Sequence, residues 1–271
     1  MENCYLCESK KFRLLKKISQ KPDNETEFDL CKDQYMRKIK ICKFCSVYIN
    51  DHSYNLDTIY SDQYNSNTYL NDIKTNFNRI QSLPFSRSDN KQRVDRIIKY
   101  FKKNGHIINN MKVLDIGSGL GVFPSEIKLH NVNVTCIDPS LVSIKHAKEN
   151  IKVDQAIHGK FLELQIKEKF DLITLNKVLE HVQNPIEMLS KAAELLKLNG
   201  LIYIEVPDGD SALKNGDITS REEFFIEHYT IFNMDSLKYL VSKSNLKIKK
   251  IQSIHEPSDK YTIYSFLSSL R

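Results

Sequence analysis

The tightest limit on the fold of this 271-residue chain comes from an apolar run that ends in three closely spaced glycines. Residues 113–121 read Val-Leu-Asp-Ile-Gly-Ser-Gly-Leu-Gly. Glycine lets a backbone turn sharply and approach a ligand closely. In open α/β sheets, loops of this kind lie at the carboxyl ends of the strands, where ligands bind. The run therefore predicts a strand, a ligand-binding loop and a following helix.

Strand and helix patterns alternate from residue 111 onward. Alternating strands and helices form a parallel sheet that is covered on both faces. The last two strands are joined only by a loop, which predicts an antiparallel hairpin at one edge. We therefore expect an α/β, Rossmann-like sheet of seven strands, mostly parallel, over residues 109–271. The expected strands are Lys112–Ile116, Asn133–Ile137, Gln155–His158, Asp171–Asn176, Leu201–Val206, Leu246–Ile251 and Tyr261–Leu267. The expected helices are Val122–His130, Leu141–Asn150, Pro185–Leu196 and Ser236–Ser244.

Two Cys-x2-Cys pairs, Cys4 with Cys7 and Cys42 with Cys45, lie in the first fifty residues. Each pair brings two thiolates to one ion, and four thiolates complete a tetrahedral Zn²⁺ site that has no open position. A module this small buries too little surface to fold alone, so the metal would contribute folding free energy. The pattern predicts a structural zinc-ribbon module over residues 1–50, and metal rather than disulfide chemistry.

Residues 51–108 are interpreted as a helical connector or lid that lies over the sheet. The segment is rich in Asn, Asp, Tyr and Ser. Within residues 93–101, apolar side chains recur at helical spacing and share one face. We expect Gly105 to end this helix. The face consists of Val94, Ile97, Ile98 and Phe101.

Two carboxylates beside the glycine loop indicate the charge of its ligand. Asp115 precedes the first glycine, and Asp138 ends the next expected strand, about twenty residues on, where a carboxylate accepts hydrogen bonds from ribose hydroxyls. The glycine spacing is G-x-G-x-G, whereas dinucleotide sites have G-x-G-x-x-G. A carboxylate repels a pyrophosphate and attracts a cationic amino-acid group. The loop therefore favours S-adenosylmethionine over NAD.

Three motifs in order carry a family resemblance. Besides the glycine loop, residues 170–182 read Phe-Asp-Leu-Ile-Thr-Leu-Asn-Lys-Val-Leu-Glu-His-Val, and residues 199–207 read Asn-Gly-Leu-Ile-Tyr-Ile-Glu-Val-Pro. With these motifs, residues 111–206 resemble a class I S-adenosylmethionine-dependent methyltransferase. The resemblance implies that three residues line the methionine end of the cofactor and that Asp138 holds its ribose. The three are Asp115, Gly117 and Gly119.

The chain departs from the family pattern at the adenine end of the expected site. The loop after the third strand usually offers an acid to the adenine amine, whereas this chain has Lys160 there. A lysine ammonium accepts no hydrogen bond. We therefore expect Phe161 and backbone groups to hold the adenine, and Asn176, at the end of the fourth strand, to contact the cofactor.

A cysteine module in front of this domain resembles methyltransferases that act on deoxysugars and surface polysaccharides. Residues 222–232 read Glu-Glu-Phe-Phe-Ile-Glu-His-Tyr-Thr-Ile-Phe, with Ser236-Leu237 following, and are similar to a segment of those enzymes. The resemblance implies a nucleotide-linked sugar as the methyl acceptor. Members that methylate carbon carry a further C-terminal domain that does not follow here, so the expectation extends to oxygen and nitrogen methylation.

Methyl transfer from a sulfonium is an in-line displacement, for which orientation alone contributes about 7–11 kcal/mol in favourable cases. A hydroxyl acceptor also benefits from a base, and histidine is the usual one. The candidates are His181, just past the fourth strand, and His228, which has Glu227 beside it to orient it. Structural roles remain open: His181 as a residue that shapes its loop, and His228 as a helix cap or lid residue.

Composition limits the partners without naming one. The formal net charge is +6, and charged residues of both signs make up 27% of the chain, which permits a nucleic-acid partner but does not select one. An RNA methyltransferase that binds through the zinc module is the alternative, favoured by the basic residues between Lys10 and Lys17 and opposed by acids in the same module. A non-catalytic cofactor-binding protein is a third reading, opposed by the intact glycine loop.

Targeting signals are absent from the sequence pattern. No apolar stretch approaches the ~20 residues of a membrane span. The N-terminus is polar and cysteine-bearing, unlike a signal peptide. We expect a cytoplasmic protein with a small-molecule partner, and the sequence predicts no oligomeric state.

Overall fold

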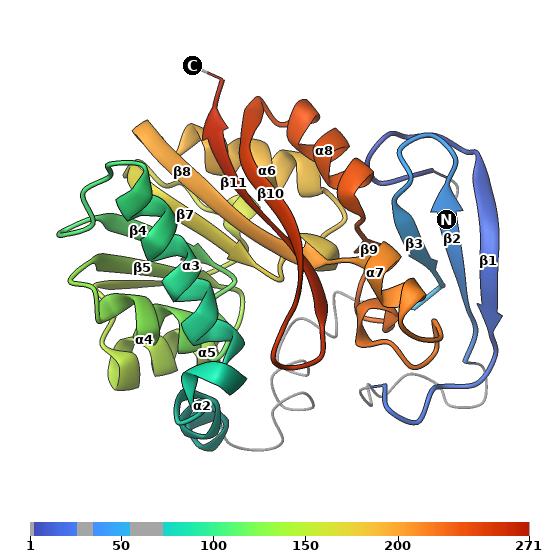
Figure 1. Ribbon diagram of the computed structural model, residues 1–271, viewed down its shortest axis with the longest axis horizontal. Coiled ribbons are helices and arrows are strands. Elements are labelled where there is room, and N and C mark those ends of the chain that lie inside the picture. The colour runs from blue at the N-terminus through green and yellow to red at the C-terminus, as the bar shows by residue number, and fades with distance from the viewer. Residues whose placement is uncertain (1–2, 26–34, 55–72, 271) are drawn as a thin grey trace.

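The protein, obtained as a computed structural model, is described over residues 3–25, 35–54 and 73–270. Its larger sheet has seven strands in the order β10-β11-β8-β7-β4-β5-β6 (Figure 1). Strands β4 to β8 run parallel to one another, and the antiparallel hairpin of β10 and β11 forms one edge, where β11 pairs antiparallel with β8. This arrangement confirms the predicted sheet. The bounds are β4 (Lys112–Ile116), β5 (Asn133–Asp138), β6 (Gln155–His158), β7 (Phe170–Asn176), β8 (Leu196–Pro207), β10 (Leu246–His255) and β11 (Tyr261–Ser269).

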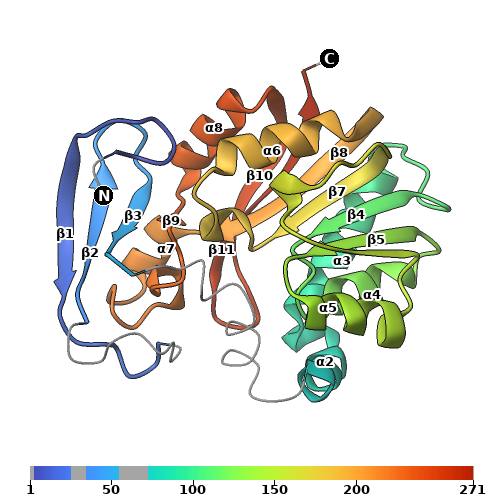
Figure 2. The ribbon, with the colours of Figure 1, turned by 180° about the vertical axis from the view of Figure 1, so that it is seen from behind.

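Helices cover both faces of this sheet because successive strand residues point to opposite sides. In β4, Val113 packs into one buried cluster and Leu114 into the other, and both are 0% exposed. The first cluster lies under α3 (Asp89–Lys103) and α4 (Val122–Lys128), with α5 (Leu141–His146) beside them (Figure 1). The second lies under α6 (Pro185–Glu194) and α8 (Met234–Lys243), seen from behind in Figure 2.

Helix α3 buries the face that its periodicity predicted. Its predicted residues Val94, Ile97, Ile98 and Phe101 are all buried, and the helix ends just before Gly105, which has a φ of +74°. The same face also carries Arg93, whose guanidinium donates to the Glu205 carboxylate of β8. This buried ion pair fixes α3 over the sheet, and α2 (Ile73–Gln81) precedes it.

The smaller sheet joins the two ends of the chain. Its order is β1-β2-β3-β9, and all of its pairs are antiparallel. Strand β9 (Thr230–Ile231) belongs to the C-terminal half and pairs with β3 (Tyr48–Asp51) of the cysteine module. The sheet is completed by β1 (Phe12–Ile18) and β2 (Arg37–Cys42). The cysteine module is therefore attached to the larger domain by strand pairing.

Several element boundaries differ from the predicted ones. The last helix begins at Met234 rather than at Ser236, because Asn233 caps it and Ser236 completes a capping box. The helix expected over 141–150 is α-helical only to His146 and continues as a π turn, η5 (Ala147–Ile151). A short helix, α7 (Gly209–Lys214), follows β8 and is not among the expected helices.

Part of the predicted connector, residues 55–72, lies outside the described residues. Within the described ranges, no helix combines the length and the apolar character that a bilayer crossing requires.

Candidate functional site

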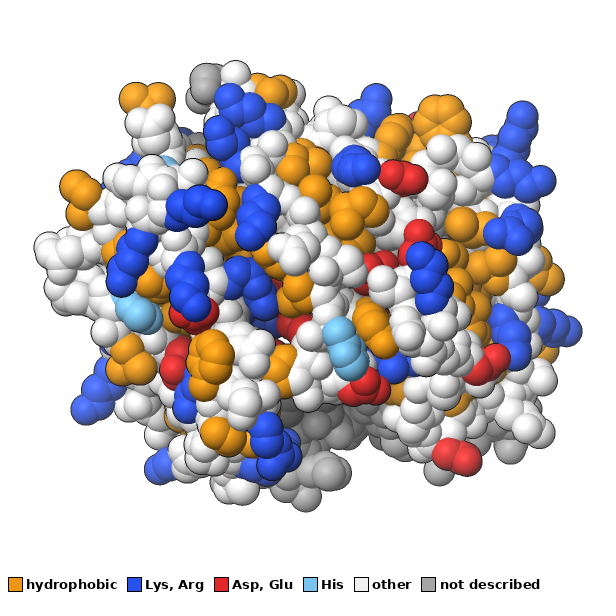
Figure 3. Space-filling model, viewed as in Figure 1, with side chains coloured by type: hydrophobic (Ala, Val, Ile, Leu, Met, Phe, Trp, Pro, Cys, Tyr) orange, Lys and Arg blue, Asp and Glu red, His pale blue; other side chains and the backbone are white. Residues whose placement is uncertain are grey.

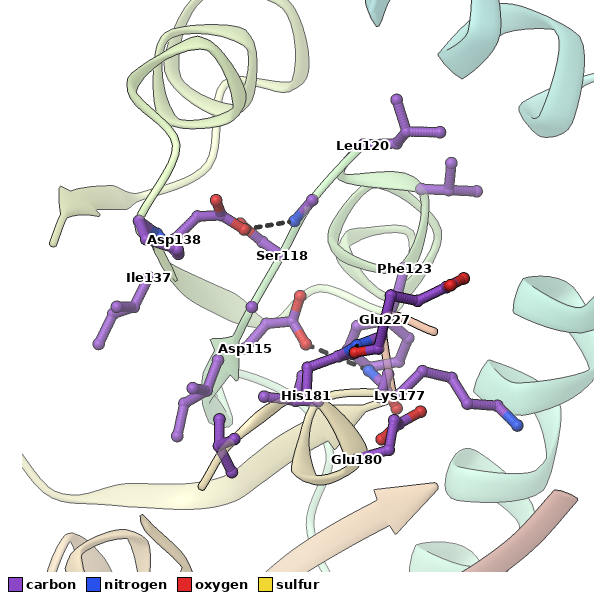
Figure 4. A pocket seen from close by; sticks show the side chains of 18 of the residues that line it. Asp115, Ser118, Leu120, Phe123, Ile137, Asp138, Lys177, Glu180, His181 and Glu227 are labelled. Carbon is purple, nitrogen blue, oxygen red and sulfur yellow. Dashed lines mark hydrogen bonds between the residues drawn. The ribbon is translucent and has the colours of Figure 1, made fainter. Parts of the chain in front are cut away.

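A cavity of about 1270 Å³ opens at the carboxyl ends of β4, β5 and β7. Its walls combine the glycine loop, the loop after β7, residues 222–229 and the turn of the β10–β11 hairpin. Figure 4 shows Asp138 on one side of Asp115, and Lys177, His181 and Glu227 gathered on the other. The site is therefore two-sided: acids beside the glycine loop face a group of histidines and acids.

The glycine loop has the conformation that its composition predicted. Gly117 and Gly119 have φ values of +73° and +49°, in the left-handed region that side-chain-bearing residues rarely adopt. A Cβ atom at Gly117 would lie 2.7 Å from the Val178 side chain, whereas one at Gly119 would meet nothing within 4 Å. The loop is thus packed on one side and open on the side where a ligand would bind.

Asp115 is held at the end of β4 by the neighbouring strand. Its carboxylate accepts hydrogen bonds from Thr174 Oγ1 at 2.6 Å and from Asn176 Nδ2 at 3.1 Å. Burial raises its pKa to about 7, and these hydrogen bonds and the Arg93 charge oppose the increase. Asn176 Oδ1 is buried with no hydrogen-bond partner among the described residues. A cationic, hydrogen-bonding ligand would satisfy both groups, so these residues fit the predicted cofactor.

Asp138 lies across the glycine loop from Asp115. Its Oδ2 accepts the Gly119 N–H at 2.8 Å, and its Oδ1 accepts the Ser140 N–H at 2.8 Å. Burial raises the pKa of this carboxyl. The two backbone bonds fix the carboxylate at the end of β5, on the cavity wall, where the sequence placed the ribose contact.

The predicted adenine end brings Lys160 and Phe161 to the cavity wall. Phe161 begins a short turn, η6 (Phe161–Glu163), and is 3% exposed, because its ring packs into the core. The Lys191 ammonium lies 5.2 Å from the centre of that ring. Lys160 is exposed. The aromatic contact with adenine stays a prediction.

Two histidines from distant segments meet on the opposite wall. His181 ends the turn η7 (Leu179–His181), and His228 lies two residues before β9. Their ring centres are 4.8 Å apart. His181 Nδ1 lies 3.2 Å from the main-chain oxygen of Glu227, and His228 Nδ1 lies 2.9 Å from that of Glu223.

These contacts define the protonation of both rings. A carbonyl oxygen only accepts, so each Nδ1 carries the proton and each Nε2 keeps its lone pair. Burial lowers the pKa of His228 to about 4 and the pKa of His181 well below its ordinary value. Both imidazoles are therefore neutral near pH 7 and present a proton-accepting nitrogen.

Glu180 lies on the same wall as the two histidines. Its side chain is fully buried, and neither carboxylate oxygen has a hydrogen-bond partner in the described part of the chain. Burial raises its pKa to about 7. One of its oxygens and a ring nitrogen from each of His181 and His228 lie within 4.8 Å of one another. In the sequence, Glu180 directly precedes the candidate base His181.

Glu227 was predicted to orient His228. In the structure, the main-chain oxygen of Glu223 contacts His228, and the main-chain oxygen of Glu227 contacts His181. Burial raises the pKa of the Glu227 carboxyl to about 8. Loop backbone therefore orients both rings.

The four module cysteines form a compact group with their sulfur atoms within 4.8 Å of one another. Two of the distances, Cys4 to Cys45 and Cys7 to Cys42, are 3.5 Å. Four thiolates about 2.3 Å from a tetrahedral Zn²⁺ would lie about 3.8 Å apart. The Phe44 N–H points at the Cys42 sulfur at 3.4 Å. The group therefore fits the predicted ion in number, chemistry and spacing.

Comparison with known proteins gives one family and a set of partial relatives. Residues 86–251, more than half of the chain, match the family described as "methyltransferase domain". The mitochondrial ubiquinone biosynthesis O-methyltransferase of Schizosaccharomyces pombe is 30% identical over 122 residues, which cover 42% of this chain and 44% of the relative. The ubiquinone biosynthesis O-methyltransferase of Glaesserella parasuis is 38% identical over 113 residues, which cover 38% of this chain and 47% of the relative. The chain thus spans about half the length of these curated relatives.

Solved structures share the fold. Magnesium protoporphyrin IX methyltransferase from Synechocystis, with bound SAH, aligns with a TM-score of 0.57 at 16% identity and covers 79% of this chain and 100% of its own. The N-methyltransferase NodS from Bradyrhizobium japonicum, with bound S-adenosyl-L-homocysteine, aligns with a TM-score of 0.52 at 15% identity. The alignment covers 73% of this chain and 99% of NodS.

Proposed function

Since this chain belongs to the family of methyltransferase domains, we propose that it moves a methyl group from S-adenosylmethionine to a hydroxyl group of a small polar molecule. One observation carries the proposal: the cavity places the buried Asp115 carboxylate of the glycine loop opposite two histidines whose Nε2 atoms accept protons. A cation site and a proton acceptor on facing walls are what this reaction needs.

When bound, the cofactor supplies a methyl group on a cationic sulfur. Asp115 would attract its positive charge, and Asp138 would accept hydrogen bonds from its ribose. As the acceptor oxygen gains the methyl group, its proton passes to Nε2 of His228, with His181 as the neighbouring candidate. That proton would bring a positive charge to the imidazole. The buried Glu180 carboxylate, beside both rings, stabilises that charge.

The wall formed by the turn of the β10–β11 hairpin supports a polar acceptor. There the turn of the β10–β11 hairpin brings charged groups into the cavity. The Lys260 ammonium pairs with Glu222 at 2.7 Å, and the Lys177 ammonium lies 3.6 Å from Glu256. Such walls solvate hydroxyl groups and would leave an apolar chain in contact with charge. A sugar fits them better than a largely apolar acceptor.

Two arginines support a nucleotide-linked form of that sugar. Arg79 and Arg87 are exposed and line the cavity from α2 and from the turn before α3. Guanidinium groups bind phosphate oxygens in pairs of hydrogen bonds. On the face of the molecule shown in Figure 3, basic side chains are distributed from end to end with acids among them, a pattern that supports a small molecule over RNA.

A labelled-cofactor assay tests this function. The enzyme is incubated with S-adenosylmethionine that carries a heavy methyl group and with separate panels of nucleotide sugars, free sugars and apolar quinols. Mass spectrometry is expected to find the label on a sugar hydroxyl. Label found only on the quinols would reject the polar acceptor, and a failure to bind S-adenosylmethionine in calorimetry would reject the proposal.

We also propose that the four module cysteines bind one structural Zn²⁺. Metal analysis of the purified protein is expected to find one zinc per chain, and Cys42→Ser is expected to lose it and to lower the Tm, because the ion supplies folding free energy. Cys136→Ala, at a buried thiol in β5 away from the module, is the matched control and should keep the zinc. Full Tm with no zinc in wild-type protein would contradict the site.

A further inference from the structure

The loop that carries His228 is held by the cysteine module. We infer that this module positions the catalytic histidine, with Asn50, Arg37 and Glu25 acting as positioning residues. The inference deepens the proposed function and depends on its assignment of His228. We refer to residues 222–229 as the histidine loop. It follows α7 of the larger domain in the chain, but side chains from the opposite end of the sequence bind its backbone.

Asn50 of β3 contacts the histidine loop on both sides of His228. Its Nδ2 donates to the main-chain oxygen of Phe225 at 2.8 Å, and its main-chain N–H donates to the oxygen of Tyr229 at 3.2 Å. The side chain is 1% exposed. Water therefore does not compete for these bonds, and the loop backbone is fixed three residues before the histidine and one residue after it.

A buried ion pair adds two further contacts. Arg37 and Glu25 pair at 2.8 Å, and both side chains are 0% exposed. The Arg37 guanidinium donates to the main-chain oxygen of Phe224 at 2.6 Å, and the Glu25 carboxylate accepts the main-chain N–H of Ile226 at 2.8 Å. One residue of the pair thus binds a loop oxygen and the other binds a loop N–H.

The chemistry of this pair favours positioning over bulk stability. Buried ion pairs contribute little net stability, and apolar replacements of similar volume often do as well. An apolar pair could not bind the Phe224 oxygen and the Ile226 N–H. The retained charges therefore satisfy loop backbone that would otherwise be buried without partners.

The contacts between the cysteine module and the histidine loop continue directly after His228. Ile49 and Tyr48 of β3 pair with Thr230 and Ile231 of β9. On its other side the loop contacts the turn η7, where the Tyr229 N–H donates to the main-chain oxygen of Glu180 at 2.8 Å. The histidine loop therefore lies between the module and the turn that carries Glu180 and His181, and contacts both. A misplacement of about 1 Å at a reacting group lowers a rate by about 10²-fold.

The test uses Asn50→Ala in the full chain, alone and combined with His228→Ala. Asn50→Ala is expected to lower kcat by about 10²-fold while the affinity for S-adenosylmethionine is unchanged. If Asn50 acts through His228, adding Asn50→Ala to His228→Ala should cost nothing further, because coupled residues are not additive. A merely structural role would lower activity in both backgrounds. Lys40→Met, which breaks an ion pair with Asp51 in the same hairpin, is the control and should keep wild-type kcat.

The outcomes separate this inference from the proposed function. Suppose that His228→Ala has a lowered kcat, as the proposed function expects. The inference alone is then overturned if Asn50→Ala keeps the wild-type kcat, or if Asn50→Ala lowers kcat equally in the wild type and in His228→Ala. A wild-type kcat in His228→Ala would overturn both the base role of His228 and the inference. Hydrogen exchange gives a readout without turnover: Glu25→Leu, which leaves no side-chain oxygen to accept the Ile226 N–H, is expected to speed exchange of the Ile226 amide. Unchanged protection of that amide would contradict the positioning role of Glu25.

Discussion

Replacing Asp115 with alanine is expected to remove measurable binding of S-adenosylmethionine while the protein stays folded. Asp115 is 2% exposed and lines the cavity, so a bound cation would leave water for a buried carboxylate. Loss of one partner of a buried charge pair costs about 2–5 kcal/mol of binding free energy. Isothermal titration calorimetry measures the affinity, and circular dichroism checks the fold.

Asp171→Ala is the matched control for this substitution. It removes a carboxylate from β7 of the same sheet, but at the amino end, where Asp171 pairs with Lys197 at 2.7 Å. Its cofactor affinity should equal that of the wild type. Wild-type affinity in Asp115→Ala would remove the assignment of the loop as a cofactor site.

The raised pKa of Asp115 adds a pH dependence. With a folded pKa of about 7, this carboxyl is mostly protonated at pH 6 and mostly ionised at pH 8. The affinity for a cation should therefore rise across that interval and level off above it. Because the folded pKa exceeds the ordinary value, this group makes the unliganded fold less stable as the pH rises towards 7. Asp115→Asn should lose both effects, which calorimetry and thermal unfolding at several pH values would show.

Features encoded locally were predicted well. The glycine loop, with Asp115 before it, lies within nine consecutive residues, and short-range turn chemistry decides its conformation. The strand and helix periods predicted every strand of the larger sheet, and its central strands β4, β5, β7 and β8 are mostly buried apolar runs. The grouping of Cys4, Cys7, Cys42 and Cys45 was predictable because spacing within each pair restricts where its sulfur atoms lie.

Features that depend on distant partners were missed for one physical reason. Arg37 and Glu205 are charged and so are expected at the surface, yet both are fully buried because a partner from another segment neutralises each of them. The partner of a charged residue cannot be identified from local pattern. Strand β9 is two residues long and exists only because β3 lies beside it. Tertiary pairing, rather than propensity, decides such elements.

The glutamate beside the histidines shows the same limit within the site. Glu180 follows a leucine and precedes His181, and nothing in that local run distinguishes a buried carboxylate from an exposed one. Its meeting with His228, 48 positions further on, results from the packing of the histidine loop against η7. Sequence patterns therefore selected the two histidines as candidate bases but did not show that a buried carboxylate lies beside them.

His228→Ala is expected to lower kcat by about 10²–10⁴-fold, the usual contribution of a positioned base, with little change in cofactor affinity. The reason is positional: Nδ1 is anchored on the Glu223 oxygen, which leaves Nε2 as the proton acceptor on the cavity wall. Steady-state kinetics with the acceptor found by mass spectrometry measures kcat, and calorimetry measures affinity. His255→Ala, at a half-exposed histidine on β10, is the control and should be unaffected.

A second substitution separates base from anchor. The side-chain amide of His228→Asn still donates a hydrogen bond to the Glu223 oxygen but offers no basic nitrogen. If His228 takes the proton, the asparagine variant should be as slow as the alanine variant; recovery of wild-type turnover in His228→Asn would show that the ring only holds the loop. His181→Ala completes the comparison, because a larger loss there than in His228→Ala would move the proton to His181. Burial lowers the pKa of both rings, to about 4 for His228, so both are neutral near pH 7 and these substitutions, not the pKa, distinguish between them.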